Sequence, residues 1–117
     1  MYQLNFLASG SEFLPGVEIA AGLVIRHPHG IVIGGKVKIG NNCYLQHNVT
    51  IGEKYIDKRA KNEYPILGNN ISIGTGAVII GNIFIADNVS IGALTLVNKD
   101  VESDSTIYGI PFKNYKK

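Results

Sequence analysis

The sequence predicts an all-β fold, a triangular solenoid of short parallel strands, from its composition and from a repeat. Glycine makes up 14 of the 117 residues, well above the average of about 7%, and isoleucine is the commonest aliphatic residue. Both features disfavour long helices. The repeat has a period of six residues and returns an aliphatic residue to the same place in each unit. Short repeats of this kind build solenoids, because each unit buries its apolar face only against its neighbours.

The repeat can be followed along most of the chain. Twelve aliphatic anchors are spaced by six residues, apart from an insertion of two residues near Pro28 and one of ten residues between Ile51 and Leu67. Glycine directly follows six of the anchors. The anchors are Ile19, Ile25, Ile33, Ile39, Leu45, Ile51, Leu67, Ile73, Ile79, Ile85, Ile91 and Val97.

Each six-residue unit predicts a short strand followed by a corner. A second apolar residue follows the anchor by four positions, as Val37 follows Ile33, and a polar pair such as Asn41-Asn42 lies between anchor and apolar residue in many units. Asn and Gly tolerate the positive φ that a tight corner requires. Three units close one coil, and coils stack at roughly 4.8 Å. Twelve anchors therefore predict about four coils.

The length suits one domain, 1–117. We expect N-terminal coils over 11–52, a loop over 53–65 that leaves the solenoid, and C-terminal coils over 66–112. Long irregular loops on a regular scaffold are often functional. The 53–65 loop is therefore a candidate cover for a binding groove.

Composition disfavours several classes of function. A net charge of +2 is too small to make nucleic acid or a membrane surface the first hypothesis. No apolar run reaches the roughly 20 residues of a membrane span. Cys43 is the single cysteine and lies at an inward position, so we expect a buried thiol and no internal disulfide. With no signal-peptide pattern at the start, a cytoplasmic location is expected.

Two histidines occupy equivalent places in successive coils. His27 and His47 each follow an anchor by two residues, and three units separate those anchors. Residues three units apart stack in a triangular solenoid, so we expect both histidines on one edge. Thr75 and Ala93 continue the column. The column has reactive histidine side chains at one end and small side chains at the other. A groove for a long, thin ligand would have this arrangement.

Several blocks of the sequence resemble the serine acetyltransferase branch of the hexapeptide-repeat acyltransferases. The block that carries most weight reads Gly22-Leu-Val-Ile-Arg-His-Pro-His-Gly-Ile-Val-Ile-Gly34. Others follow in the family's order: Ser11–Pro15, Leu45–Gly52, Ile73–Asn82, Ile91–Val101 and Tyr108–Lys113, where Phe112 departs from the small residue expected. The resemblance implies a left-handed parallel β-helix, although parallel crossovers are otherwise almost always right-handed.

The resemblance also implies a chemistry, the transfer of an acetyl group from acetyl-CoA to a hydroxyl. His27 matches the family's general base, and Glu12 matches the carboxylate that orients it. An imidazole, with a pKa near 6.5, suits proton transfer at neutral pH. A carboxylate beside it would fix the tautomer and stabilise the imidazolium.

The family further implies a homotrimer that binds acetyl-CoA along a groove between neighbouring subunits, with no metal cofactor. Thr75 and Ala93 would line this groove for the pantetheine arm. Lys99 and Lys113 would meet the nucleotide phosphates, because ammonium groups bind phosphate well.

The acceptor is where the sequence departs from serine acetyltransferases. Their β-helix follows a large helical domain that this chain does not show before Glu12. Arg26 replaces an acidic residue beside the base, and Glu63-Tyr64 replaces an Arg-His pair. We therefore expect a sugar hydroxyl as acceptor, as in small transferases of surface-polysaccharide biosynthesis. Arg26, His47 and Tyr64 would hydrogen-bond to it.

Three other functions remain open. The first is a serine O-acetyltransferase-like enzyme of cysteine biosynthesis. The second is a trimeric β-helix scaffold without catalytic activity. The third is a metal enzyme of the γ-carbonic anhydrase type, for which His27, His29 and His47 would be the available ligands.

Overall fold

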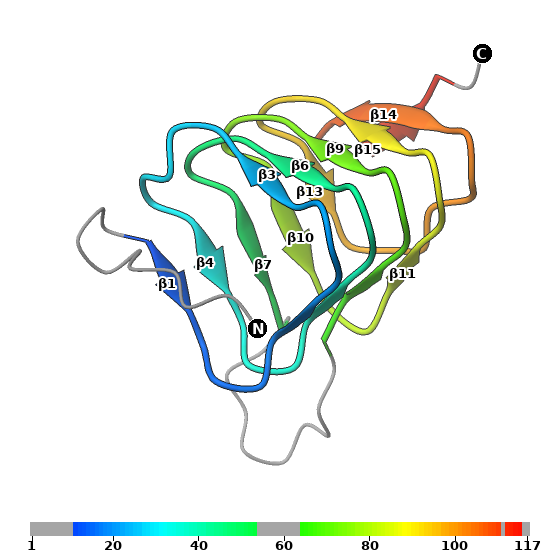
Figure 1. The fold of residues 1–117 in the computed structure, drawn as a ribbon. Helices are drawn as coiled ribbons and strands as arrows, with labels where there is room; N and C mark the ends of the chain where they lie inside the picture. Colours follow the sequence, from blue (N-terminus) through cyan, green and yellow to red (C-terminus); the bar gives the residue numbers. More distant parts are fainter. Residues whose placement is uncertain (1–10, 54–63, 111, 116–117) are drawn as a thin grey trace.

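The computed structural model describes residues 11–53, 64–110 and 112–115, and these ranges form fifteen short strands and no helix. The chain winds into a three-sided prism of stacked coils (Figure 1). The predicted all-β class is confirmed, and the coil is the left-handed parallel β-helix of hexapeptide-repeat proteins. The structure describes no helix that is long and apolar enough to cross a membrane.

Each of the first four coils contributes one strand to each of three sheets (Figure 1), and the last coil reaches the second sheet through a bridge between Val101 and Ile85. The first sheet contains β1 (Glu12–Phe13), β4 (Val32–Ile33), β7 (Thr50–Gly52), β10 (Val78–Ile80) and β13 (Leu96–Val97). The second contains β2 (Glu18–Ile19), β5 (Lys38–Ile39), β8 (Ile66–Leu67) and β11 (Phe84–Ile85). The third contains β3 (Val24–Ile25), β6 (Tyr44–Leu45), β9 (Ser72–Ile73), β12 (Ser90–Ile91), β14 (Thr106–Gly109) and β15 (Phe112–Asn114).

All pairings are parallel except that of β15, which returns antiparallel beside β14. Where the repeat is regular the partners follow the expected spacing, as Val32 pairs with Thr50. Across the ten-residue insertion Thr50 pairs with Val78, and across the two-residue insertion Glu12 pairs with Val32. Both insertions therefore leave the ladder intact. Most of the predicted 53–65 loop, residues 54–63, lies outside the described residues.

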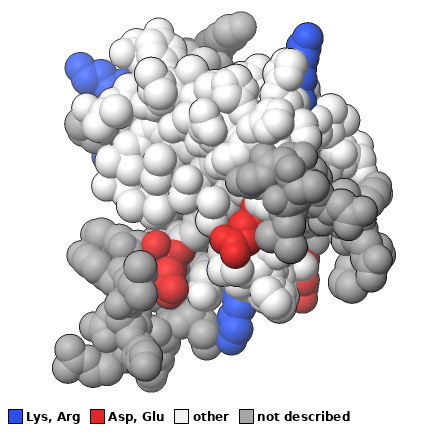
Figure 2. Space-filling view, turned by 90° about the vertical axis from the view of Figure 1, so that its left-hand side faces the viewer, with Lys and Arg blue, Asp and Glu red and all other residues white. Residues whose placement is uncertain are grey.

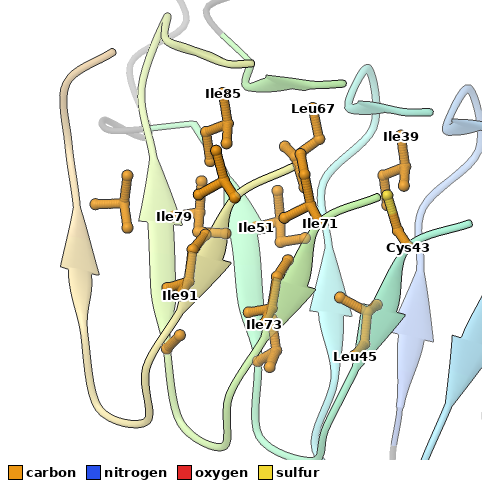
Figure 3. Close-up of a cluster of buried hydrophobic side chains, with 14 of the residues drawn as sticks. Ile39, Cys43, Leu45, Ile51, Leu67, Ile71, Ile73, Ile79, Ile85 and Ile91 are labelled. Carbon is orange, nitrogen blue, oxygen red and sulfur yellow. The ribbon is translucent and has the colours of Figure 1, made fainter. Parts of the chain in front are cut away.

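The inward anchors build one continuous core along the prism axis (Figure 3). Ten of the twelve predicted anchors, from Ile33 to Val97, are buried there. Ile19 and Ile25 are only partly buried, because they belong to the first described coil, which is covered by another coil on one side. At the other end Phe112 packs against the core from β15. Its departure from the family's small residue supplies a larger apolar side chain at that end.

Removing a central anchor should destabilise the protein far more than removing an outward residue of similar size. Ile79 is fully buried in β10, whereas Ile66 in β8 is 42% exposed. We expect Ile79→Ala to lower the free energy of unfolding by about 2–5 kcal/mol, because it leaves a cavity among fixed neighbours. Ile66→Ala should lower it by less than about 1 kcal/mol. Urea unfolding measures both, and equal losses would contradict the assignment of Ile79 to the core.

Candidate functional site

The two-residue insertion forms a bulge at the corner between the third and first sheets. We call this edge, with its turns at 26–31, 46–49, 74–77 and 92–95, the histidine corner. His27 has a φ of 58°, in a region that residues other than glycine rarely occupy. The His29 amide donates to the His27 carbonyl at 2.7 Å, which closes a tight turn around Pro28. The bulge thus holds a histidine in a conformation that the local sequence does not favour.

The backbone register at this corner corrects the predicted column. The amides of Asn48, Gly76 and Leu94 donate to the carbonyls of His29, His47 and Thr75 respectively, at 2.8, 3.1 and 2.8 Å. The column therefore reads His29, His47, Thr75, Ala93, and His27 lies in the bulge beside it. The prediction placed the insertion after His27, whereas the hydrogen bonds place it at His27 and Pro28.

The ring of His27 nevertheless meets that of His47. The ring centroids lie 6.0 Å apart and the planes are inclined by 85°, an edge-to-face arrangement. His27 is exposed, while His47 is half-buried. The Nδ1 atom of His47 is buried and has no hydrogen-bond partner among the described residues. One exposed imidazole is thus supported by a second, more buried one from the next coil.

A polar network runs from this corner along the third sheet. The Thr75 hydroxyl and amide both donate to Gln46 Oε1, at 2.7 and 3.1 Å. Hydrogen bonds with Arg26, and then with Gln46, hold the pKa of the Tyr44 phenol below its ordinary value. The Arg26 side chain is thus engaged by its neighbour on the sheet.

Glu12, the predicted partner of the base, lies on β1 with an exposed side chain. Among the described residues its carboxylate makes no hydrogen bond with the His27 ring. The preceding residue does contact the bulge. Ser11 is 1% exposed, and its hydroxyl donates to the Pro28 carbonyl at 2.8 Å. Ser11 is not among the predicted site residues, although a polar residue at an inward position of the repeat was a signal for it.

Tyr64 lies at a different corner of the same chain. Its ring packs beside Gly34, where a Cβ atom would lie 3.1 Å from Tyr64 Cε1. Gly34 directly follows β4, whereas the histidine corner precedes it. One chain alone therefore does not bring Tyr64 to His27, and its predicted contact with the acceptor stays a prediction.

The predicted acetyl-CoA residues occupy separate places on the last coils. Ala93 is exposed at the histidine corner, next to Thr75. Lys99 follows β13 at the opposite end of that strand, and its Nζ lies 5.3 Å from the centroid of the Phe112 ring. Lys113 is exposed on β15, opposite Tyr108. The structure thus brings Thr75 and Ala93 together, while the two lysines lie elsewhere on the last coil and its tail.

Metal binding and thiol chemistry gain no support from the described residues. No three His, Cys, Asp or Glu side chains within 11–53, 64–110 and 112–115 are placed to hold a metal ion. Cys43 is buried, burial raises the pKa of its thiol, and Sγ lies 3.4 Å from the Gly68 carbonyl oxygen. A neutral buried thiol is a core residue and a poor nucleophile.

A β-helix of six-residue repeats with a histidine base candidate at one corner defines the class of hexapeptide-repeat acyltransferases, and relatives narrow that class. No family model matches the sequence. The chain is 41% identical over 108 residues to a serine acetyltransferase of Synechococcus elongatus, covering 92% of this chain and 43% of that protein. It is 38% identical over 117 residues to the Helicobacter pylori serine acetyltransferase, covering 98% and 66%.

Solved structures of serine acetyltransferases have the same fold as this chain. The serine acetyltransferase of Neisseria gonorrhoeae superposes with a TM-score of 0.87 at 34% identity, over 92% of this chain and 41% of that one. Its structure in complex with serine gives 0.83 at 34% identity, over 90% and 42%. The chain belongs to the serine acetyltransferase-like branch of the hexapeptide-repeat acyltransferases. It spans between about two fifths and two thirds of the length of these relatives.

These relatives overturn the expected sugar acceptor. The hypothesis of polysaccharide biosynthesis relied on Arg26 and Glu63-Tyr64, which differ from the family pattern, and on the short segment before Glu12. All the relatives compared above are serine acetyltransferases. Arg26 counted against serine because its charge was taken to face the acceptor. In the structure its side chain is hydrogen-bonded to Tyr44.

The link between Arg26 and Tyr44 can be measured directly. The largest cause of the lowered pKa of Tyr44 is its hydrogen bond with Arg26. We expect Arg26→Met to raise this pKa toward the ordinary value of about 10, because the donor that favours the phenolate is lost. Arg26→Lys, which keeps a cation but not the planar guanidinium, is the matched control and should raise it less. NMR titration of 13C-labelled tyrosine follows the change. An unchanged Tyr44 pKa in Arg26→Met would show that Arg26 points elsewhere.

Proposed function

We propose that this protein transfers an acetyl group from acetyl-CoA to the hydroxyl of serine. The observation that carries the proposal is the His27–His47 ring pair at one corner of a scaffold shared with serine acetyltransferases. A relative with this scaffold, the serine acetyltransferase of Neisseria gonorrhoeae, has a solved structure in complex with serine. A cytoplasmic location belongs to the same proposal.

In the proposed reaction His27 is the general base. Its exposed ring accepts the proton of the acceptor hydroxyl as the oxygen attacks the thioester carbonyl of acetyl-CoA. The C–S bond then breaks, and the imidazolium of His27 donates the proton to the leaving thiolate of CoA. A positioned base of this kind contributes roughly 10²–10⁴-fold to the rate. His47, inclined against the His27 ring, restricts its orientation.

Glu12 would stabilise the imidazolium that forms during the reaction. Its carboxylate is exposed on β1, next to the residue that contacts the bulge. A carboxylate that rotates toward the ring only when the ring is charged contributes through the transition state rather than through the resting structure. The absence of a hydrogen bond in the resting chain is compatible with this role.

Acetyl-CoA binding and assembly complete the proposal. Thr75 and Ala93 would line the groove that holds the pantetheine arm, since they continue the column above His47. Lys99 and Lys113 would meet the phosphates. A homotrimer would bring the corner that carries Tyr64 in one chain toward the histidine corner of its neighbour. Arg26, His47 and Tyr64 stay candidates for contacts with the acceptor.

The described surface drawn in Figure 2 belongs mostly to uncharged residues. Acidic and basic side chains both lie on its lower part. Arg26 is exposed, and its guanidinium lowers the pKa of the neighbouring Tyr44 phenol.

The base can be tested against a histidine in the same bulge. We expect His27→Ala to lower kcat/KM for acetyl transfer to serine by at least about 10²-fold, because the hydroxyl then loses its proton acceptor. His29→Ala, two residues away and also exposed, should keep most of the activity. Thiol release from acetyl-CoA with serine measures both. If both variants lose activity equally, the bulge as a whole is needed and His27 has no special role.

Glu12→Gln should lower kcat by less than His27→Ala does. The amide keeps the shape of the side chain but removes the charge that stabilises an imidazolium. The same thiol-release assay, followed across pH, measures the change. Equal kcat in Glu12→Gln and the unaltered protein would remove Glu12 from the mechanism.

Calorimetry that detects no acetyl-CoA binding to the unaltered protein would instead favour the scaffold hypothesis.

A further inference from the structure

Ser11 joins the start of the described chain to both sides of the histidine bulge. It is one of three buried polar residues in the described ranges, with 1% exposure. Its hydroxyl donates to the Pro28 carbonyl oxygen at 2.8 Å and accepts from the Ile31 amide at 3.1 Å. A hydroxyl can do both because it carries one donor and two acceptor sites. One side chain therefore satisfies two backbone groups that flank the insertion.

Within residues 11–53, 64–110 and 112–115, neither of these two backbone groups has a partner in the strand ladder. The regular hydrogen bonds between coils continue up to Arg26, whose amide donates to the Leu45 carbonyl. They begin again at Val32. Between them the chain leaves the regular register by two residues. Pro28 has no N–H to contribute, and His27 adopts a φ of 58°. A conformation of that kind is strained and persists only where the surroundings hold it.

The far side of the bulge is held from the next coil. The Asn48 amide donates to the His29 carbonyl at 2.8 Å, and the Asn48 side chain lies where a Cβ on Gly30 would be. That contact fixes His29 and Gly30 but not the residue that carries the exposed ring. On the side of His27 the bulge is fixed through Pro28, and the partner there is Ser11.

We infer that Ser11 is a positioning residue, whose hydroxyl fixes the His27–Pro28 bulge so that the His27 ring meets the His47 ring. This inference rests on the proposed role of His27 as the base. Ser11 itself touches no reacting atom. Its effect on the reaction passes through the backbone of Pro28 to the direction of the neighbouring imidazole, and misplacement of a base by about 1 Å can lower a rate by as much as 10²-fold.

A second buried serine provides a matched control. Ser105 is 2% exposed near the C-terminal end of the described chain. Its hydroxyl also bridges two groups, donating to the Glu102 carbonyl at 2.7 Å and accepting from Asn114 Nδ2 at 2.9 Å. Ser11→Ala and Ser105→Ala therefore remove the same kind of buried, doubly bonded hydroxyl. The two serines differ in that only Ser11 contacts the histidine bulge.

The experiment compares kcat, KM and stability in the two variants. We expect both to unfold at lower urea concentration than the unaltered protein, because each leaves buried polar groups without partners. Only Ser11→Ala should lower kcat, by roughly 10- to 100-fold, with an unchanged KM for acetyl-CoA. Equal kcat losses in both variants, or an unchanged kcat in Ser11→Ala, would overturn the inference.

Two further measurements keep the test independent of folding and of the proposed activity. If Ser11→Ala does not fold, Ser11→Cys replaces it, because a thiol fills similar space but is a weak hydrogen-bond partner; it should lower kcat in the same direction. NMR relaxation of the His27 amide and ring should show increased motion in the Ser11 variant but not in Ser105→Ala. If the unaltered protein transfers no acetyl group, the proposed function fails, while the relaxation data still decide whether Ser11 fixes the bulge.

Discussion

The corner is the constraint on which the rest of this structure depends. A chain that turns every six residues needs residues in the left-handed region of φ at its turns, and seven non-glycine residues in the described part of the chain adopt it. Five of them are Asn or Asp, whose short polar side chains reduce the strain. At the corner between the second and third sheets, Asn69 and Asp87 side chains also accept a backbone amide from the preceding coil, both at 2.7 Å. Corners therefore bind coils together as the strands do.

The two exceptions to this chemistry both lie at the histidine corner. They are His27, at 58°, and Leu94, at 57°. The Leu94 side chain covers Gly76, where a Cβ would lie 2.7 Å from Leu94 Cδ2, and it is itself 66% exposed. Unfavourable backbone conformations concentrated at one edge are typical of functional sites, where the surrounding structure holds them. The other corners carry residues that suit their conformation.

Much of the fold could be predicted because one physical rule repeats along the chain. Inward aliphatic residues at a period of six placed ten anchors in the core, and both insertions fell outside the ladder. The site was harder, because its geometry depends on single contacts. Whether His27 or His29 stays in the column is decided by one hydrogen bond, from the Asn48 amide. The sugar acceptor was a wrong prediction, because the departures at Arg26 and Glu63-Tyr64 were given more weight than the blocks shared with serine acetyltransferases.

The displacement of His27 from the column sets how its ring meets that of His47. Residues in the column stack at the inter-strand spacing of roughly 4.8 Å, and His29, which lies in the column, is exposed as well. The two-residue insertion moves His27 beside the column, where its ring meets His47 at 6.0 Å and nearly at right angles. That placement leaves one imidazole exposed while a second supports it. Regular repeats build the rigid support, and the irregular residues held against it supply the chemistry.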